Sequence, residues 1–221
     1  MALSTEYWMS SWKAGDIVFH NDFIYPMLQK HAEKLFDNQS NCRVFVPLCG
    51  KSLDMKWFAD LGHSVVGVDV SEVGILSFFE DQGIEYVKES VPEIQGATRY
   101  KSKDGKITIY KANLFSMKKD IIGDFDCIWD NGSLVAINKQ DRQKYVSTLT
   151  SLMADSCRYL LIALDFDPIK SGVLHPFDVP NSVVKELYEP TCTLEKLDAS
   201  SYRVHGREAV YYETVFLMKP K

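Results

Sequence analysis

The sequence lacks the cysteine patterns that stabilise small secreted proteins or hold structural metal ions. Its five cysteines, at positions 42, 49, 127, 157 and 192, are odd in number and include no Cys-x-x-Cys pair. This spacing disfavours a disulfide framework and predicts free thiols in a reducing compartment, so we expect a cytoplasmic protein. No cluster of histidine, cysteine and acidic residues indicates a metal site, and we predict none.

Long apolar runs and clusters of basic residues are also missing. No stretch approaches the roughly 20 apolar residues that a membrane-spanning helix needs. The first residues, which include Glu6, Trp8 and Lys13, lack the apolar centre of a secretory signal. The net charge of -5 disfavours binding to nucleic acid or to an anionic membrane. We therefore expect a small molecule as the partner, no nucleic acid, no membrane contact, and a monomer.

What the sequence does contain is typical of one α/β domain. Its 221 residues are 46% hydrophobic and 25% charged, which is ordinary for a globular protein. A chain of this length buries roughly 70% of its unfolded surface in a single core. No internal repeat, low-complexity tract or interdomain linker divides it. We predict a single domain over residues 1–221, with an N-terminal helical cover at 1–36 and an α/β core at 42–221.

The core is organised around residues 43–52. They predict a short buried strand, a tight turn at Cys49 and Gly50, and a helix that starts near Ser52, whose side chain caps it. A second apolar strand follows at residues 64–70, with Asp69 near its end. An acid about 20 residues after a strand–turn–helix unit is placed to accept hydrogen bonds from both hydroxyls of a ribose. A nucleoside-bearing cofactor is therefore the first hypothesis.

Of three kinds of nucleotide-binding site, the sequence of this unit favours one. A P-loop needs a glycine at position 45, which is Phe45, so the sequence Gly-Lys-Ser at residues 50–52 does not form one. A dinucleotide fold needs several glycines near the pyrophosphate, and this turn has only Gly50. A nucleoside cofactor without phosphates, such as S-adenosylmethionine, escapes that requirement. An ordinary βαβ unit with an unrelated acid at Asp69 is the competing interpretation.

The rest of the chain alternates between helix and strand patterns. Helices are predicted at residues 25–36, 73–82, 139–153 and 181–188, and strands at 85–87, 99–102, 106–110, 125–130, 159–164, 192–197 and 211–218. The run at 159–164 is apolar throughout, as a central strand covered on both faces should be. The loop 131–134 follows a strand end and is expected to face the ligand. We predict a doubly wound, mostly parallel, seven-stranded sheet of the class I, S-adenosylmethionine-dependent methyltransferase type, whose last strand is antiparallel.

Several sequence blocks carry a family resemblance. They are Trp8-x3-Trp12-x2-Gly15-x3-Phe19-His20, Phe45-x-Pro47-Leu48-Cys49-Gly50-Lys51, Met55-Lys56-Trp57-Phe58-Ala59-Asp60, Gly62-His63-Ser64-Val65-Val66-Gly67-Val68, Trp129-Asp130-x-Gly132-x-Leu134-Val135-Ala136-Ile137-Asn138 and Asp141-Arg142. In these blocks the chain resembles the thiopurine S-methyltransferase family, and more broadly the thiol and halide methyltransferases related to it. The match runs in register from Trp8 to about Asp167 and is weak after that.

The resemblance implies an enzyme that uses S-adenosyl-L-methionine to methylate the sulfur of small aromatic or heterocyclic thiols such as thiopurines. S-Adenosyl-L-homocysteine is then the product. The sulfonium methyl is already activated, and an aromatic thiol is substantially ionised near neutral pH, so rate should come mainly from alignment and exclusion of water. Two alternatives stay open: a halide, hydrosulfide or chalcogen methyltransferase of the same superfamily, and an adenosyl-cofactor binding protein without activity.

The resemblance also implies site residues. Asp69 would hold the ribose and the segment Asn113-Leu114 would contact the adenine. The full set expected at the cofactor is Trp8, Trp12, Phe19, Leu48, Cys49, Gly50, Asp69, Asn113, Leu114 and Asn131. The acceptor would contact Phe19, Asn131 and Arg203. Asp141 would accept or relay a proton, with capping of the next helix or pairing with Arg142 as the alternative role.

Two positions depart from the vertebrate enzymes of this family. Asp69 stands where they have a glutamate, which is one methylene longer, and either acid can hold a diol. Asn131 stands where they have an arginine at the crevice. Because that cation is missing, we expect weaker recognition of an anionic acceptor.

The aromatic residues ahead of the first strand are expected to form a lid. Left uncovered, Trp8, Trp12 and Phe19 would form an exposed apolar patch, which soluble proteins seldom keep without use. Their faces would also stabilise a sulfonium cation. We predict that this segment becomes ordered over the cofactor and excludes water, and permanent packing in the core is the competing interpretation.

Overall fold

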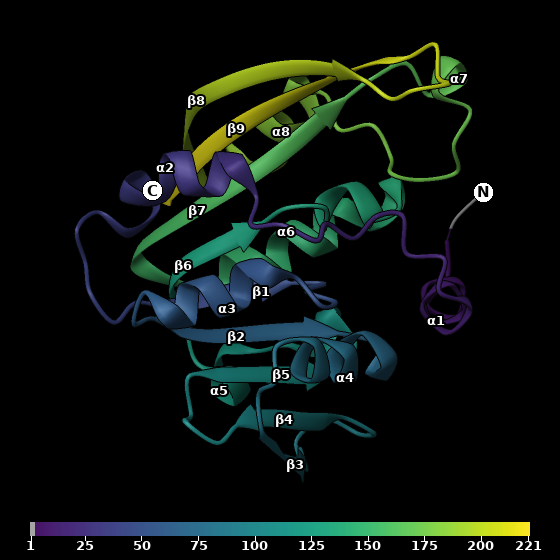
Figure 1. Ribbon diagram of the computed structural model, residues 1–221. Helices are drawn as coiled ribbons and strands as arrows, with labels where there is room; N and C mark the ends of the chain where they lie inside the picture. Colours follow the sequence, from purple (N-terminus) through teal and green to yellow (C-terminus); the bar gives the residue numbers. More distant parts are fainter. Residues whose placement is uncertain (1–2) are drawn as a thin grey trace.

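A computed structural model describes residues 3–221, and one nine-stranded sheet lies at its centre (Figure 1). The strands are β1 (Arg43–Pro47), β2 (Ser64–Asp69), β3 (Tyr86–Ser90), β4 (Thr98–Ser102), β5 (Ile107–Lys111), β6 (Phe125–Asp130), β7 (Met153–Asp165), β8 (Cys192–Arg203) and β9 (Val210–Pro220). Their order across the sheet is β3-β4-β5-β2-β1-β6-β7-β9-β8.

Seven neighbouring strands of this sheet form the predicted doubly wound unit. β5, β2, β1, β6 and β7 pair in parallel, while β9 pairs antiparallel with both β7 and β8. The mostly parallel sheet with an antiparallel last strand is therefore confirmed. The predicted count of seven is two strands short, because β3 and β4 extend the sheet beyond β5 as an antiparallel pair.

Helices cover both faces of this sheet, as a buried parallel sheet requires. The helices are α1 (Thr5–Ala14), α2 (Pro26–Phe36), α3 (Leu53–Asp60), α4 (Glu72–Asp81), α5 (Lys119–Ile122), α6 (Arg142–Ser151), α7 (Pro168–Ser171) and α8 (Asn181–Tyr188), with single turns η1 (Leu114–Ser116), η2 (Leu134–Ala136) and η3 (Lys139–Asp141). Successive residues of β1 face opposite sides. Val44 and Val46 belong to the core beneath α2, α3 and α4, whereas Phe45 belongs to the core beneath α5, α6 and α8.

Several element boundaries differ from the predicted ones. The predicted helix at 139–153 is shorter, because α6 ends at Ser151 and Met153 already begins β7. β8 and β9 are longer than the predicted strands, because the antiparallel pairing continues from Cys192–Pro220 to Arg203–Val210. The predicted cap at Ser52 is confirmed: its Oγ accepts a hydrogen bond from the backbone N–H of Asp54 at 3.3 Å. No helix within residues 3–221 is both long enough and apolar enough to cross a membrane.

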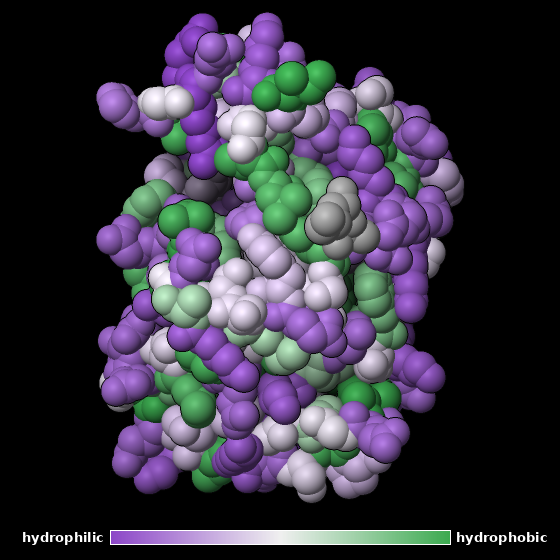
Figure 2. All heavy atoms as spheres, turned by 90° about the vertical axis from the view of Figure 1, so that its right-hand side faces the viewer, coloured by the Kyte–Doolittle hydropathy of each residue, from purple (hydrophilic) through white to green (hydrophobic). Residues whose placement is uncertain are grey.

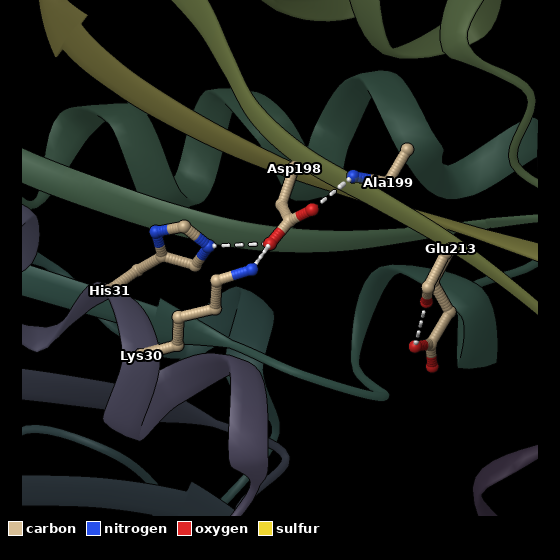
Figure 3. Close-up of polar contacts among 6 residues, drawn as sticks. Lys30, His31, Asp198, Ala199 and Glu213 are labelled. Carbon is tan, nitrogen blue, oxygen red and sulfur yellow. Dashed lines mark hydrogen bonds and ion pairs between the residues drawn. The ribbon is translucent and has the colours of Figure 1, made fainter.

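An ion-pair cluster attaches α2 to the far edge of the sheet (Figure 3). On β8, Oδ2 of Asp198 accepts hydrogen bonds from Nζ of Lys30 at 2.5 Å and from Nε2 of His31 at 3.1 Å. Its Oδ1 accepts from the backbone N–H of Ala199. These partners lower the pKa of Asp198 to about 2. The cluster holds α2 in place. Tyr25, which immediately precedes this helix, lines the cleft described below.

The carboxyl ends of the parallel strands meet at one edge of the sheet, on the right of Figure 1. Helix α1 lies beside this edge, and the C-terminus lies on the opposite side of the molecule. Figure 2 looks onto this edge and shows hydrophobic side chains gathered among hydrophilic ones in the middle and upper part of the face. In doubly wound sheets, ligands bind at this edge.

Candidate active site

A cleft of about 540 Å³ opens where strands β1, β2, β6 and β7 end. Residues that follow or end these strands form its base: Leu48, Asp69, Asn131 and Leu164. The α1 segment and the loop after it form one wall, and the β8–β9 connection with the start of β9 forms another. The cleft therefore lies where the topology of the sheet predicts a ligand site.

Asp69 ends β2 at the base of the cleft, and its carboxylate is buried. Oδ2 accepts a hydrogen bond from the backbone N–H of Gly50 at 2.9 Å, and Oδ1 accepts one from Ser71 at 2.8 Å. Burial raises the pKa of Asp69, and the backbone N–H groups act against that rise. A carboxylate has about four acceptor positions, so each oxygen keeps one for a ligand hydroxyl. Asp69 both fixes the turn and can hold a diol.

The turn after β1 adopts a backbone that few residues tolerate. Leu48 and Gly50 both have positive φ, at 44° and 47°, and Cys49 between them is buried. Glycine is needed at position 50, because a Cβ there would lie 2.7 Å from Cζ2 of Trp12. Burial raises the pKa of the Cys49 thiol, so this cysteine serves the turn and is not a reactive thiolate.

The α1 segment packs over this turn. Trp12 is only 8% exposed, and its indole lies against Gly50 and against Gly74 of α4, where an added Cβ would be 3.0 Å from the ring. Phe19 packs edge-on against both Trp8 and Trp12, at centroid distances of 5.5 and 5.7 Å. The predicted cover thus lies over the cleft in this structure.

A pair of hydrogen bonds attaches the start of this cover to the η2–η3 region. The backbone N–H of Leu3 donates to Oδ1 of Asn138 at 2.7 Å, and Nδ2 of Asn138 donates to the carbonyl of Leu3 at 2.9 Å. Ser4 caps α1 by accepting from the N–H of Tyr7, and Gly15 ends the helix with φ of 73°. The cover therefore contains a formed helix whose start is attached to Asn138.

The wall opposite the cover contains a chain of buried polar side chains. Asp54 accepts from the backbone N–H of Tyr25 at 3.0 Å and from Nε1 of Trp129 at 2.8 Å. The hydroxyl of Tyr25 donates to Oε1 of Glu213 on β9. Burial raises the pKa of Asp54 and, together with Glu213, that of Tyr25. Tyr25, Asp54 and Glu213 line the cleft, so this chain presents both donor and acceptor atoms to a ligand.

A second buried network holds the loop after β6. Asp130, fully buried, accepts from the hydroxyls of Tyr145 at 2.7 Å and Tyr159 at 2.6 Å, and from the backbone N–H of Leu134 at 3.3 Å. Burial raises the pKa of Asp130. Ser133 in the same loop donates to the carbonyl of Pro47 at 2.7 Å. These bonds fix the loop whose first residue, Asn131, lines the cleft.

The structure brings eight of the twelve sequence-predicted site residues together in this cleft. They are Trp8, Trp12, Phe19, Leu48, Cys49, Gly50, Asp69 and Asn131. Asn113 lies instead in an adjoining hollow of about 220 Å³, to which Thr5 and Met9 of α1 also contribute. Val70 lines both hollows, so a ligand reaching from Asp69 to Asn113 would pass this residue. Leu114 is buried in the core beside this hollow and lines neither cavity.

The two remaining predicted residues, Asp141 and Arg203, also line neither hollow. Asp141 stands at the start of α6, where its nearest polar side-chain partner is Nδ2 of Asn138 at 3.5 Å. It neither caps the helix through its side chain nor pairs with Arg142, which donates to the carbonyl of Asp178. Arg203 is exposed at the end of β8 and donates to the carbonyl of Glu208 at 3.4 Å. Neither is placed to touch a ligand in the cleft.

Other residues of the cleft were not predicted from the sequence. Tyr25, His175, Arg207 and Glu213 line it, and all come from segments far from the β1–β2 unit in sequence. Arg207 was partly indicated by the sequence, because it lies four residues after the predicted site residue Arg203, in the connection formed by residues 203–207. The other three stand in stretches without a recognisable motif. Within residues 3–221, no group of three or more His, Cys, Asp or Glu side chains is arranged to hold a metal ion.

The cleft fits a nucleoside that carries a sulfonium and no phosphate. Asp69 offers free acceptor positions for a ribose, Gly50 lets Trp12 pack closely on the turn, and aromatic rings form one wall. The aromatic faces of Trp8, Trp12 and Phe19 suit a cation. The glycine-rich turn that a pyrophosphate needs is missing. The donor set therefore matches an S-adenosyl cofactor.

Similarity to known proteins agrees with this geometry. A family model described as thiopurine S-methyltransferase matches residues 3–216. Thiopurine S-methyltransferases of Equus caballus and Oryctolagus cuniculus are 42% and 41% identical to this chain, over 99% of it and 91% of their own length. Among solved structures, 1,6-didemethyltoxoflavin-N1-methyltransferase of Burkholderia thailandensis, bound to S-adenosylhomocysteine, has a TM-score of 0.66 at 15% identity, over 98% of this chain and 87% of that one. That structural likeness concerns the fold, whereas the sequence matches identify the family. The chain belongs to the thiopurine S-methyltransferase family.

Proposed function

We propose that this protein transfers a methyl group from S-adenosylmethionine to the sulfur of small aromatic or heterocyclic thiols, such as thiopurines. Membership of the family over nearly the whole chain carries the proposal. The cleft supports it, because it joins an acid suited to a ribose with an aromatic cover suited to a sulfonium. When bound, the sulfonium supplies a methyl group that is already activated for displacement.

The protein's part in this reaction is to bind, orient and exclude water. Asp69 would hold the ribose, and the Cys49–Gly50 turn and Trp12 would bind the cofactor beside it. Asn113 would contact the adenine from the adjoining hollow. Alignment of the acceptor sulfur within such a closed cleft contributes most of the rate where the leaving group is already activated.

Methyl transfer from labelled S-adenosylmethionine to a panel of acceptors tests the proposal. The panel contains thiopurines, thiophenols and inorganic sulfide. Transfer to the aromatic and heterocyclic thiols supports the proposed function. Transfer to sulfide alone would instead assign the chain to the halide, hydrosulfide or chalcogen enzymes, and cofactor binding without any transfer would assign it to inactive binding proteins.

Asn131 is proposed to set the choice of acceptor. It follows β6 at the mouth of the cleft and carries no charge. We expect Asn131→Arg to raise kcat/KM for a thiobenzoate carboxylate about 2- to 10-fold relative to a neutral thiophenol, because a partly exposed ion pair contributes about 0.5–1.5 kcal/mol. Kinetics with the two acceptors measure this ratio, and Asn131→Gln is the neutral control. A change in cofactor affinity alone would place the residue at the carboxylate of the cofactor instead.

The N-terminal cover is proposed to act as a lid that opens without cofactor. Limited proteolysis with and without S-adenosylhomocysteine tests this, since a lid should be cut near Lys13 only in the empty protein. Gly74→Ala should speed that cut, because the new Cβ would lie 3.0 Å from the indole of Trp12 and displace it. Glu80→Ala, on an exposed position of the same helix, is the control. Equal resistance in both ligand states would mean that the aromatic residues are permanent core packing.

We also propose that the chain is a single domain that works as a monomer in the cytoplasm. All five cysteines are free and buried, which suits a reducing compartment. Light scattering after size-exclusion chromatography tests the oligomeric state.

A further inference from the structure

His175 lies in the cleft within a group of aromatic rings. Its imidazole centroid is 4.8 Å from the ring of Trp8, 5.6 Å from Tyr7 and 6.0 Å from Phe19. The loop that carries it is held to the site elements, since Phe177 donates to the carbonyl of Val135 at 2.7 Å. Among residues 3–221, neither ring nitrogen of His175 takes part in a hydrogen bond, so its lone pair is available to a ligand.

The charges around His175 favour a neutral ring. Desolvation lowers the pKa of His175, and Arg207 from the β8–β9 connection lowers it further, whereas Asp16 after α1 raises it. Tyr7 of α1 is the remaining titratable side chain against the ring. Because the net shift is downward from the ordinary value, the imidazole is mostly unprotonated at neutral pH and can accept a proton.

The acidic groups of the cleft already accept hydrogen bonds from other groups of the protein. Asp69 accepts from two backbone N–H groups, Asp54 accepts from Tyr25 and Trp129, and Glu213 accepts from Tyr25. Asp141 lies outside the lining. His20 also lines the cleft, but within residues 3–221 no aromatic ring packs against its imidazole, whereas three rings of the cover surround His175. His175 is therefore the base with a free acceptor atom beside the aromatic cover.

We propose that His175 takes the proton from the sulfur of the acceptor thiol before methyl transfer. The S–H bond breaks and its electron pair stays on sulfur, while the proton forms an N–H bond on the imidazole. The thiolate then attacks the methyl carbon: a new S–C bond forms, the C–S bond to the sulfonium breaks with its electron pair going to the adenosyl sulfur, and the products are a thioether and S-adenosylhomocysteine. The imidazolium afterwards releases its proton to water. This inference rests on the proposed thiol methyltransferase function and names the group that activates the acceptor.

The role predicts a dependence on the acidity of the acceptor. A thiol that is largely ionised in solution needs no base, whereas a weakly acidic thiol does. Removing a positioned general base lowers the rate by about 10²- to 10⁴-fold. We expect His175→Gln to lower kcat/KM by about 100-fold or more for weakly acidic thiols. For thiophenols with electron-withdrawing substituents, which are already ionised, the change should be small.

The experiment compares wild type, His175→Gln, His20→Gln and Glu213→Gln across a series of thiols of increasing acidity. His205→Gln, an exposed histidine outside the cleft, is the matched control. A loss in His175→Gln that grows as acceptor acidity falls supports the proposal. An equal loss for all acceptors, no loss, or the same graded loss in His20→Gln or Glu213→Gln alone would overturn it. If wild type methylates no thiol, the proposed function itself fails, which is a distinguishable result.

A second measurement does not depend on turnover. In the complex with S-adenosylhomocysteine, the ultraviolet absorbance of a bound weakly acidic thiophenol reports its thiolate fraction. We expect the thiolate to appear at a lower pH in wild type than in His175→Gln, because the imidazole accepts the proton. In wild type, kcat/KM for such a thiol should also fall at low pH as His175 becomes protonated. His175→Gln should lack this fall. Identical titrations in the two proteins would overturn the proposal.

Discussion

Replacing Asp69 with alanine should weaken the binding of S-adenosylhomocysteine roughly 10- to 150-fold. The reason is that a hydrogen bond to a charged group contributes about 1.5–3 kcal/mol, and this carboxylate keeps acceptor positions for the ribose. Isothermal titration calorimetry measures the change. Because Asp69 also holds the N–H groups of Gly50 and Ser71, part of the loss could come from a loosened turn.

A ligand without ribose hydroxyls separates the two effects. Wild type should bind the 2′,3′-dideoxy analogue of S-adenosylhomocysteine more weakly than the parent compound. Asp69→Ala should bind the two alike, since the group that distinguishes them is gone. If the variant still prefers the parent compound by the wild-type factor, Asp69 acts on the turn only and another residue holds the ribose.

Replacing Asp130 with alanine should lower the free energy of unfolding by about 2–6 kcal/mol. The change leaves the hydroxyl of Tyr145 and the backbone N–H of Leu134 without their buried acceptor, and it leaves Tyr159 with the hydroxyl of Tyr188 alone; each unsatisfied group costs about 1–3 kcal/mol. For a chain of this size, each kcal/mol shifts Tm by about 2–4 °C, so the loss is large enough to resolve. Urea unfolding followed by circular dichroism measures it.

Asp130→Asn serves as the matched comparison. The amide keeps the shape of the side chain and one carbonyl acceptor, so it can satisfy one of the two tyrosines. We expect its loss of stability to be smaller than that of alanine. Losses of equal size would show that the tyrosine hydroxyls do not cause the loss of stability. The cause would then be lost packing under the loop that begins at Asn131.

The sequence predicts the central part of the fold because the signals there are local. The apolar strands at 43–47 and 64–69, the cap at Ser52 and the acid at Asp69 are all read from neighbours within about 25 residues. The strands at 85–87 and 99–102 were predicted but not counted in the seven-stranded sheet, because every residue of β3 is exposed and its sequence lacks the apolar alternation that marks a strand packed on a core. Strand β8 was drawn too short, because its register shift between Lys196 and Asp198 interrupts the alternation that marks a strand.

The cleft was predictable where it follows strand ends and much less so elsewhere. Tyr25, His175 and Glu213 meet only because α2, the loop after β7 and β9 converge in three dimensions. No spacing rule connects such positions along the chain. Arg203 and Arg207 show the same limit. The ladder between β8 and β9 ends where Arg203 pairs with Val210, and this pairing places Arg207, not Arg203, in the turn. A sequence pattern alone does not fix that register.

The direction of β9 has a practical consequence for handling the protein. Because β9 runs antiparallel to β7, its last residues lie at the edge of the sheet opposite the cleft, near α2 in Figure 1. The segment at Leu3, by contrast, is bonded to Asn138 beside the cover. Immobilisation on a sensor surface, or fusion to a fluorescent reporter, is therefore best made through Lys221. Attachment there leaves the mouth of the cleft and its cover unobstructed.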